Sequence, residues 1–287
     1  SALGRMTRKS PVGAFRSFAK GKKVGWLSFG GWINAIIPVL IVPYYSVIGG
    51  WVVKYLFEYI RGNGSKLAED GYFSGFISNG GATEICFVIF CMFTLVIIYA
   101  GVQNGIERVS KIMMPILIVL SVIIAIYSVT RPGAIEGVKY FLVPNVKNFS
   151  WMTVVAAMGQ MFYSLSIAMG ILVTFGSYMR KDTSIEDSTR NVEIFDTAIA
   201  MMAGLMIIPA VFAFSGGDPD TLQAGPSLMF ITIPKVFANM GFGTAVGILF
   251  FVLVLFAAVT SSIALTESAV STFEDELDWR SEERRVG

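Results

Sequence analysis

The chain has 287 residues, of which 54% are hydrophobic and only 15% are charged, and its formal net charge is +2. Together with a mean hydropathy of +0.67, this composition excludes an ordinary soluble domain and indicates a polytopic membrane protein. The charge gives no indication of a nucleic-acid partner. The chain has no histidine, the commonest general base and metal ligand, and no pairing of nucleophile and base is visible, so we expect no enzyme.

Apolar runs long enough to cross a bilayer as helices recur along the chain, since the hydrocarbon layer needs about 20 residues. We predict spans at about 30–60, 84–104, 109–130, 151–179, 195–215 and 241–273, with outer-loop helices at about 219–239. Residues 1–277 then form one transmembrane domain. Residues 278–287 form a charge-rich tail of unclear origin.

The basic residues predict the orientation of these spans. Residues 1–23 carry Arg and Lys but no acid, which is typical of a segment retained in the cytoplasm beside anionic lipid. An even number of crossings returns the C-terminal end to the same side. We therefore expect a multi-pass protein of the plasma membrane with both ends of this chain cytoplasmic.

The 241–273 span carries hydroxyl groups near its middle. Ala257, Thr260 and Ser261 stand at i, i+3 and i+4, which places a carbonyl and two hydroxyls on one helix face. Such a face can bind a small hard cation. Alternatively, both hydroxyls bond back to carbonyls one turn earlier.

The 151–179 span has polar residues and glycine at its centre, from Gln160 to Gly170. A break at mid-membrane exposes backbone groups that a ligand, an ion or water must satisfy, so a break indicates a binding site. The alternative is an unbroken, tilted helix in which Ser164 and Ser166 bond internally.

Charged and helix-weakening residues near the spans allow further expectations. Glu267 should face the bundle interior or a wet cavity. Asp196 begins the fifth predicted span, where a carboxylate is often only a favourable partner of the helix dipole. Glu274–Glu276 should form a solvated acidic face. Gly105 and Pro115 weaken the start of the 109–130 span, which can then unwind easily or simply be kinked.

Several separate strings resemble the neurotransmitter:sodium symporter family, in particular its bacterial amino-acid transporters, and they keep the family's order and spacing. These strings are Tyr44-Tyr45 with Gly50-Trp51; Gly105-Ile106-Glu107-Arg108 with Lys111 and Pro115; Gly159-Gln160 with Ser164-Leu165-Ser166 and Gly170; Phe230 to Pro234; and Thr260 to Ala264 followed by Glu274 to Leu277.

The resemblance implies an all-α, leucine-transporter-like bundle, a partial inverted repeat whose sixth family helix is broken. It implies that the chain is a fragment covering spans three to eight of about twelve, without the other broken helix, span one. By this comparison the fragment alone should not transport.

The resemblance also implies roles for individual residues. Ala257, Thr260 and Ser261 correspond to the helix-eight half of the second sodium site, and Ser164 to a ligand of the first. Asp196 lies within one residue of the family's helix-seven Asn ligand, and its carboxylate leads us to expect chloride independence.

The substrate pocket and the gates follow from the same resemblance. The implied pocket residues are Ile41, Tyr45, Tyr163, Ser166, Met169, Ser261 and Leu265. Tyr45 and Tyr163 correspond to the outer gate, and Tyr178 and Asp275 to the inner gate. Gly105, Pro115 and Glu267 correspond to positions that couple ion release to conformation. The apolar members of the pocket favour a hydrophobic or aromatic amino acid.

The expected function is sodium-coupled symport of amino acids or related small amines by alternating access. The alternatives are a substrate sensor on the same fold that does not transport, and a proton-coupled carrier in which Glu267 or Asp196 takes the proton. The expected partners are Na+, an amino acid and the lipid bilayer. The particular substrate, the sodium stoichiometry and the oligomeric state stay open.

Overall fold

Long apolar helices dominate the fold. The computed structural model describes residues 1–19, 26–100, 107–167, 169–215, 225 and 228–276, and within these ranges it contains helices and no strand. The helices there that can cross a membrane by length and composition are α3 (Leu27–Ile60), α6 (Gly80–Tyr99), α7 (Arg108–Val129), α11 (Ile185–Ser215) and α13 (Gly243–Glu276). The predicted class, an all-α polytopic membrane protein, is confirmed.

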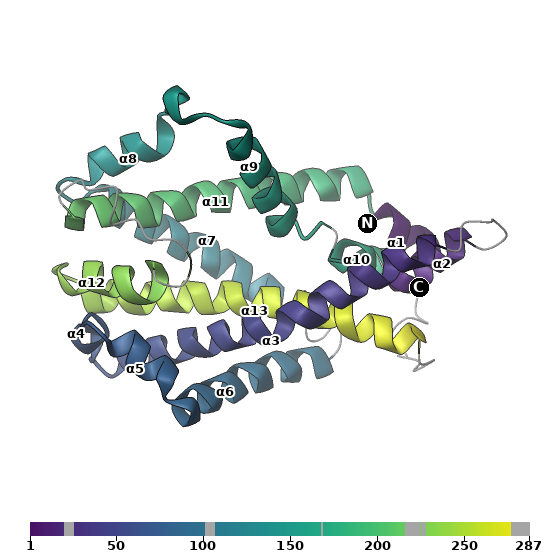
Figure 1. The fold of residues 1–287 in the computed structure, drawn as a ribbon, viewed down its shortest axis with the longest axis horizontal. Coiled ribbons are helices and arrows are strands. Elements are labelled where there is room, and N and C mark those ends of the chain that lie inside the picture. Colours follow the sequence, from purple (N-terminus) through teal and green to yellow (C-terminus); the bar gives the residue numbers. More distant parts are fainter. Residues whose placement is uncertain (20–25, 101–106, 168, 216–224, 226–227, 277–287) are drawn as a thin grey trace.

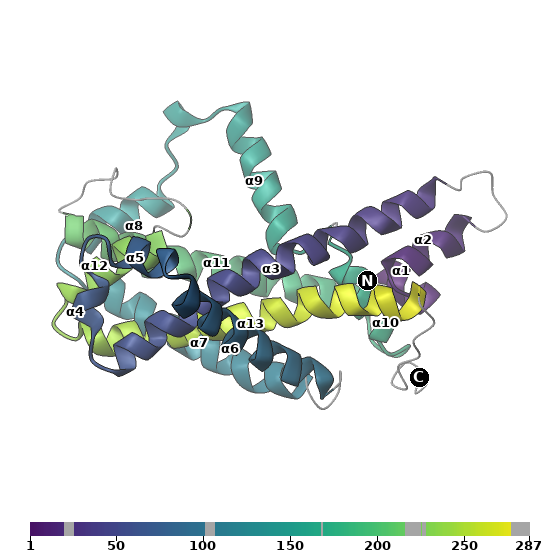
Figure 2. The ribbon, with the colours of Figure 1, turned by 60° about the horizontal axis from the view of Figure 1, so that its bottom comes forward.

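These helices form a bundle along the long axis of the molecule (Figure 1). The central helix α13 packs against α3, α6 and α7, while α11 packs on α7. The remaining crossing is interrupted, because α9 (Trp151–Ser164) and α10 (Ile171–Tyr178) are separate helices. The predicted broken helix is therefore confirmed over the continuous, tilted one. Helix α9 has no buried residue and stands away from the bundle over most of its length (Figure 2).

Short helices gather at the two ends of the bundle (Figure 1). Helices α1 (Ala2–Thr7), α2 (Pro11–Ala19) and α10 lie at one end, called here the α1–α2 end. The opposite end, called the α4–α12 end, holds α4 (Gly64–Leu67), α5 (Tyr72–Ser78), η4 (Leu228–Thr232) and α12 (Ile233–Ala238). Helix α8 (Ala134–Leu142) and a 3-10 turn, η2 (Val146–Asn148), connect α7 to α9.

An aromatic core joins α3, η4 and α13 in the half of the bundle near the α4–α12 end. The side chains of Tyr55, Phe230 and Phe251 are fully buried there. The Tyr55 hydroxyl donates a 2.8 Å hydrogen bond to the carbonyl of Phe230, so the ring's polar tip is satisfied. Burying one such ring contributes about 1.5–3 kcal/mol, which fixes α13 against α3.

One helix begins much earlier than predicted. Helix α11 starts at Ile185 and not near residue 195, because the Ser184 hydroxyl accepts the Asp187 amide at 3.2 Å and caps the helix start. Glu186 and Asp187 occupy its first turn, where carboxylates favour the helix dipole. The interpretation of Asp196 as a residue at a helix start is therefore wrong, since it lies inside α11.

Other predicted ranges coincide only partly with the described residues. Helix α6 covers residues 80–99, whereas 101–104 of that predicted span lie outside the described ranges. Within the predicted outer-loop region 219–239, the segment 228–238 is helical. The tail from 278 to 287 also lies outside the described residues.

Candidate functional site

The break between α9 and α10 contains a left-handed backbone conformation that glycine adopts readily. Gly170 has a φ of 74°, and Ser166 has a φ of 54°, both in the left-handed region. A Cβ atom on Gly170 would lie 2.7 Å from Pro11 Cγ, and 3.0 Å from both the Asn34 carbonyl oxygen and Ser268 Oγ. The break is thus held between α2, α3 and α13, and only glycine fits at position 170.

A side chain of α13 satisfies a carbonyl that the break leaves without a helical partner. The Ser268 hydroxyl is buried and donates to the Met169 carbonyl at 3.3 Å. Next to it, Thr174 of α10 and Ser271 of α13 share a hydrogen bond of 3.1 Å. The sequence analysis missed Ser268, although its spacing of two helical turns from Ser261 on an apolar helix was a usable signal.

A hydroxyl and a carboxylate meet at the α9 side of the break. The Ser164 hydroxyl donates to Oδ1 of Asp196 at 2.6 Å, which joins α9 to α11. The alternative of a continuous span required Ser164 to bond within its own helix. Its hydroxyl instead bonds to a carboxylate of another helix. Both side chains carry oxygen lone pairs, which hard cations prefer as ligands. The assignment of both to a first sodium site stays a prediction.

The hydroxyls in the middle of α13 behave in two different ways. Thr260 bonds back to the carbonyls of Phe256 at 3.0 Å and Ala257 at 3.1 Å, which is the alternative raised for it from sequence. The Thr260 oxygen still has acceptor lone pairs and lies on the same face as the Ala257 carbonyl. Ser261 is exposed, and the Tyr45 phenol of α3 lies near it.

Apolar side chains from α3, α10 and α13 pack together beside the break. Met169, Ile171 and Leu265 are buried together, and Ile41 and Tyr45 pack against them. Tyr163, at the end of α9, lies close enough to both Tyr44 and Tyr45 for electrostatic interaction. Most of the residues predicted for the substrate pocket thus lie around the break, with Ser166 inside it.

A buried acid links α13 to α10 nearer the α1–α2 end. Glu267 is 7% exposed, and its Oε1 accepts a 2.6 Å hydrogen bond from the Tyr178 hydroxyl. A carboxylate in an apolar helix needs such a partner. The residue therefore faces the bundle interior.

The end of α13 is not a freely solvated acidic face. Asp275 accepts a hydrogen bond from the Ser10 amide, and Glu276 forms an ion pair of 2.8 Å with Arg16. Helix α2 packs against α13, which brings these groups together. The expectation of a solvated face is therefore wrong for Asp275 and Glu276.

The predicted coupling segment is only partly described. Gly105 lies outside the described residues, and Pro115 lies inside α7 without ending that helix. At the start of α7, Lys111 Nζ contacts Glu107 Oε1 at 2.6 Å and holds the pKa of the Glu107 carboxyl below its usual range. The proposed unwinding of this segment stays a prediction.

The chain matches the model of the Sodium:neurotransmitter symporter family over residues 72–286. This range includes nearly all of residues 278–287, which the sequence analysis described as a tail of unclear origin. It is 36% identical to the uncharacterised sodium-dependent transporter YhdH of Bacillus subtilis, covering 94% of this chain and 59% of that protein. An uncharacterised sodium-dependent transporter of Haemophilus influenzae is 32% identical, with 96% of this chain and 62% of that protein covered. The chain thus spans about three fifths of the length of these relatives.

A similar structure has been solved. The crystal structure of MhsT in complex with L-phenylalanine has a TM-score of 0.84 and 37% sequence identity, and the match covers 99% of this chain and 63% of that one. The broken helix and the bundle around it define a multi-pass membrane protein with the fold of secondary transporters. The chain belongs to the sodium:neurotransmitter symporter family.

Proposed function

We propose that the complete protein is a sodium-coupled symporter of amino acids or related small amines that works by alternating access. The observation that carries this proposal is the break between α9 and α10, where the Ser164 hydroxyl contacts the Asp196 carboxylate and apolar side chains of α3 and α13 surround the next turn. Broken helices supply unpaired backbone groups that can hold an ion and the charged ends of a substrate.

Two groups of oxygens are the proposed sodium ligands. Ser164 and Asp196 belong to the first, and Ala257, Thr260 and Ser261 to the second. Sodium moves with the substrate as cargo. Each net positive charge that crosses 100 mV contributes about 2.3 kcal/mol, enough for a roughly fifty-fold concentration ratio of substrate. The Asp196 carboxylate also supports chloride independence, because it supplies a fixed negative charge beside the first group.

The proposed substrate is an amino acid with an apolar or aromatic side chain. In the proposed pocket Ile41, Met169 and Leu265, which pack together beside the break, supply apolar walls, and Ser166 and Ser261 supply hydroxyls. The similarity to MhsT, which was solved with L-phenylalanine, supports this choice. Both ends of this chain are proposed to lie in the cytoplasm, in keeping with the basic first segment.

A proton-coupled carrier is the competing function, and one observation favours it. Glu267 is buried among helices and hydrogen-bonded to Tyr178, as a proton-carrying acid would be. The same contact equally serves as a structural latch between α10 and α13. The nature of the driving ion therefore has to be measured.

Uptake of labelled L-phenylalanine by proteoliposomes that contain the complete protein tests the proposal. We expect accumulation when an inward sodium gradient is imposed at equal pH on both sides, and none when potassium replaces sodium. Uptake driven by a pH gradient in sodium-free buffer would select the proton-coupled carrier instead. Sodium-dependent binding of L-phenylalanine without uptake would indicate a substrate sensor that does not transport.

A further inference from the structure

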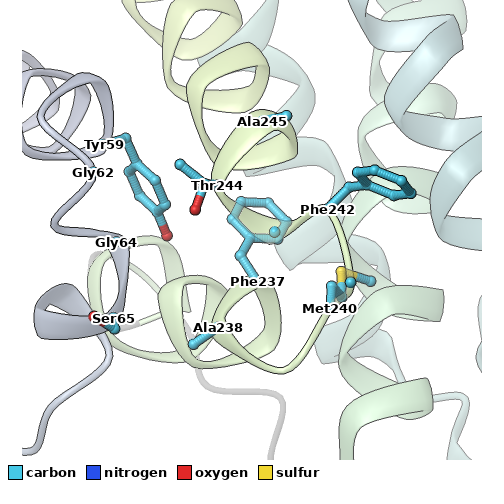
Figure 3. A pocket seen from close by; sticks show the side chains of 12 residues that line it. Tyr59, Gly62, Gly64, Ser65, Phe237, Ala238, Met240, Phe242, Thr244 and Ala245 are labelled. Carbon is cyan, nitrogen blue, oxygen red and sulfur yellow. The ribbon is translucent and has the colours of Figure 1, made fainter.

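A cavity lies at the α4–α12 end of the molecule, far along the bundle from the break (Figures 1 and 3). It has a volume of about 380 Å³ and lies between the end of α3, α4, α12 and the start of α13. Its lining combines apolar side chains with hydroxyl groups, among them Phe237, Met240, Tyr59, Ser65 and Thr244. None of its lining residues carries a charge.

The Tyr59 hydroxyl is the unusual group in this cavity. Tyr59 is 1% exposed, yet its hydroxyl has no hydrogen-bond partner among the described residues. The ring is fixed, because it stacks on Phe251 at 5.4 Å, and a Cβ on Gly247 or Gly64 would lie 2.3 or 2.9 Å from a ring carbon. The hydroxyl therefore keeps its direction, toward the space that the Thr244 hydroxyl also faces (Figure 3). A buried hydroxyl in this state destabilises the fold unless a ligand pairs with it.

The start of α13 adds further hydrogen-bond donors. Thr244 and Ala245 line the cavity in the first turn of this helix, where backbone N–H groups have no helical acceptor. The neighbouring amides are already used, since Gly243 donates to Met240 and Val246 donates to Phe242, both at 3.0 Å. The first turn of α13 carries no acid, so no side chain of that turn offsets the positive end of its helix dipole beside the cavity.

Charges near the cavity also favour an anion. Arg61, directly after α3, and Lys66 of α4 adjoin the lining and are exposed, and neither forms an ion pair within 4.0 Å among the described residues, although Arg61 lies near the Glu58 carboxylate. Asp70, by contrast, is engaged by Lys235 at 2.5 Å, and this contact holds the pKa of the Asp70 carboxyl below its usual range. The lining has no carboxylate that could form an ion pair with an ammonium group.

We propose that this cavity binds a small carboxylate that has an apolar or aromatic body and no ammonium group. The carboxylate accepts hydrogen bonds from the Tyr59 and Thr244 hydroxyls and from the first-turn amides of α13. The apolar body packs against Phe237 and Met240. Because the ligand contacts the end of α3, α12 and the start of α13, it fastens these elements to one another.

The probe for the test is 3-phenylpropionate, which is phenylalanine without its amino group. Its dissociation constant is measured by calorimetry on the purified complete protein in sodium-free potassium buffer. We expect binding without sodium, weakened about tenfold by Tyr59→Phe, which removes one hydrogen bond to a charged group and keeps the ring. Thr244→Pro should weaken it as well, because it removes a hydroxyl and an amide in a helical turn that tolerates proline.

The matched control is Tyr45→Phe, the same substitution at the break. It should leave the binding of 3-phenylpropionate unchanged. The proposal is overturned if the probe does not bind at millimolar concentration, if Tyr59→Phe binds it as tightly as the wild type, or if Tyr45→Phe weakens its binding as much as Tyr59→Phe does. The inference does not depend on the proposed transport function, whose failure would appear separately, as absent sodium-driven uptake.

Discussion

At the scale of single residues, the contact between Ser164 and Asp196 carries the proposed chemistry. A hydroxyl from α9 donates to a carboxylate from α11 at 2.6 Å, at the place where the α9 helix ends. This hydrogen bond also positions the end of α9, a helix with no buried residue.

Asp196→Asn tests the charge of this pair. Asparagine can still accept the Ser164 hydrogen bond, but it provides no negative charge to a cation. We expect the sodium concentration for half-maximal uptake to rise about tenfold in the complete protein. Glu193→Gln is the matched control, because Glu193 is an exposed acid of the same helix. Equal sodium dependence in Asp196→Asn and wild type would remove Asp196 from the sodium site.

Ser261→Ala tests the second group of oxygens. Loss of one cation ligand should raise the sodium requirement of uptake about ten- to hundredfold. The neighbouring variant Ser262→Ala serves as control, since Ser262 is buried and its oxygen lies 3.5 Å from Thr94 Oγ1 of α6. If both variants change the sodium requirement equally, the effect is one of packing and the assignment of Ser261 is wrong.

At the scale of elements, the break depends on Gly170. A non-glycine residue in the left-handed region costs about 1–3 kcal/mol, and the added methyl group would also meet Pro11, Asn34 and Ser268. We therefore expect Gly170→Ala to lower the thermal unfolding midpoint in detergent by several degrees and to reduce substrate binding. Gly159→Ala should not lower it, because Gly159 lies inside α9 with no atom within 4 Å of an added Cβ. Equal midpoints for both variants would contradict this view of the break.

The elements also show what can be predicted from sequence. Serines and glycine inside an overlong apolar run predicted the break, because they weaken a helix whose backbone hydrogen bonds would otherwise stay intact in lipid. The start of α11 was missed, since a change from apolar to charged residues marks the membrane boundary and not the helix boundary. Partners far apart in the chain, such as Ser10 with Asp275 or Ser268 with Met169, depend on tertiary packing, and no local pattern contains them.

At the scale of the whole molecule, α3 and α13 form the framework to which the broken crossing is attached. The aromatic core fastens these two helices near the α4–α12 end, while Ser268 and Glu267 of α13 hold the break and α10 toward the other end. Sodium and substrate are proposed to bind at this single junction. An ion that binds well only when substrate is present then shifts the same conformational equilibrium as the substrate.

The most direct test of this junction is equilibrium binding of L-phenylalanine to the complete protein at a series of sodium concentrations, together with sodium binding at a series of phenylalanine concentrations. Shared ligands predict that each raises the affinity of the other by the same factor, on the order of ten or more, and that Ser261→Ala reduces this factor. A phenylalanine affinity that is equal in sodium and in potassium would contradict a common site at the break.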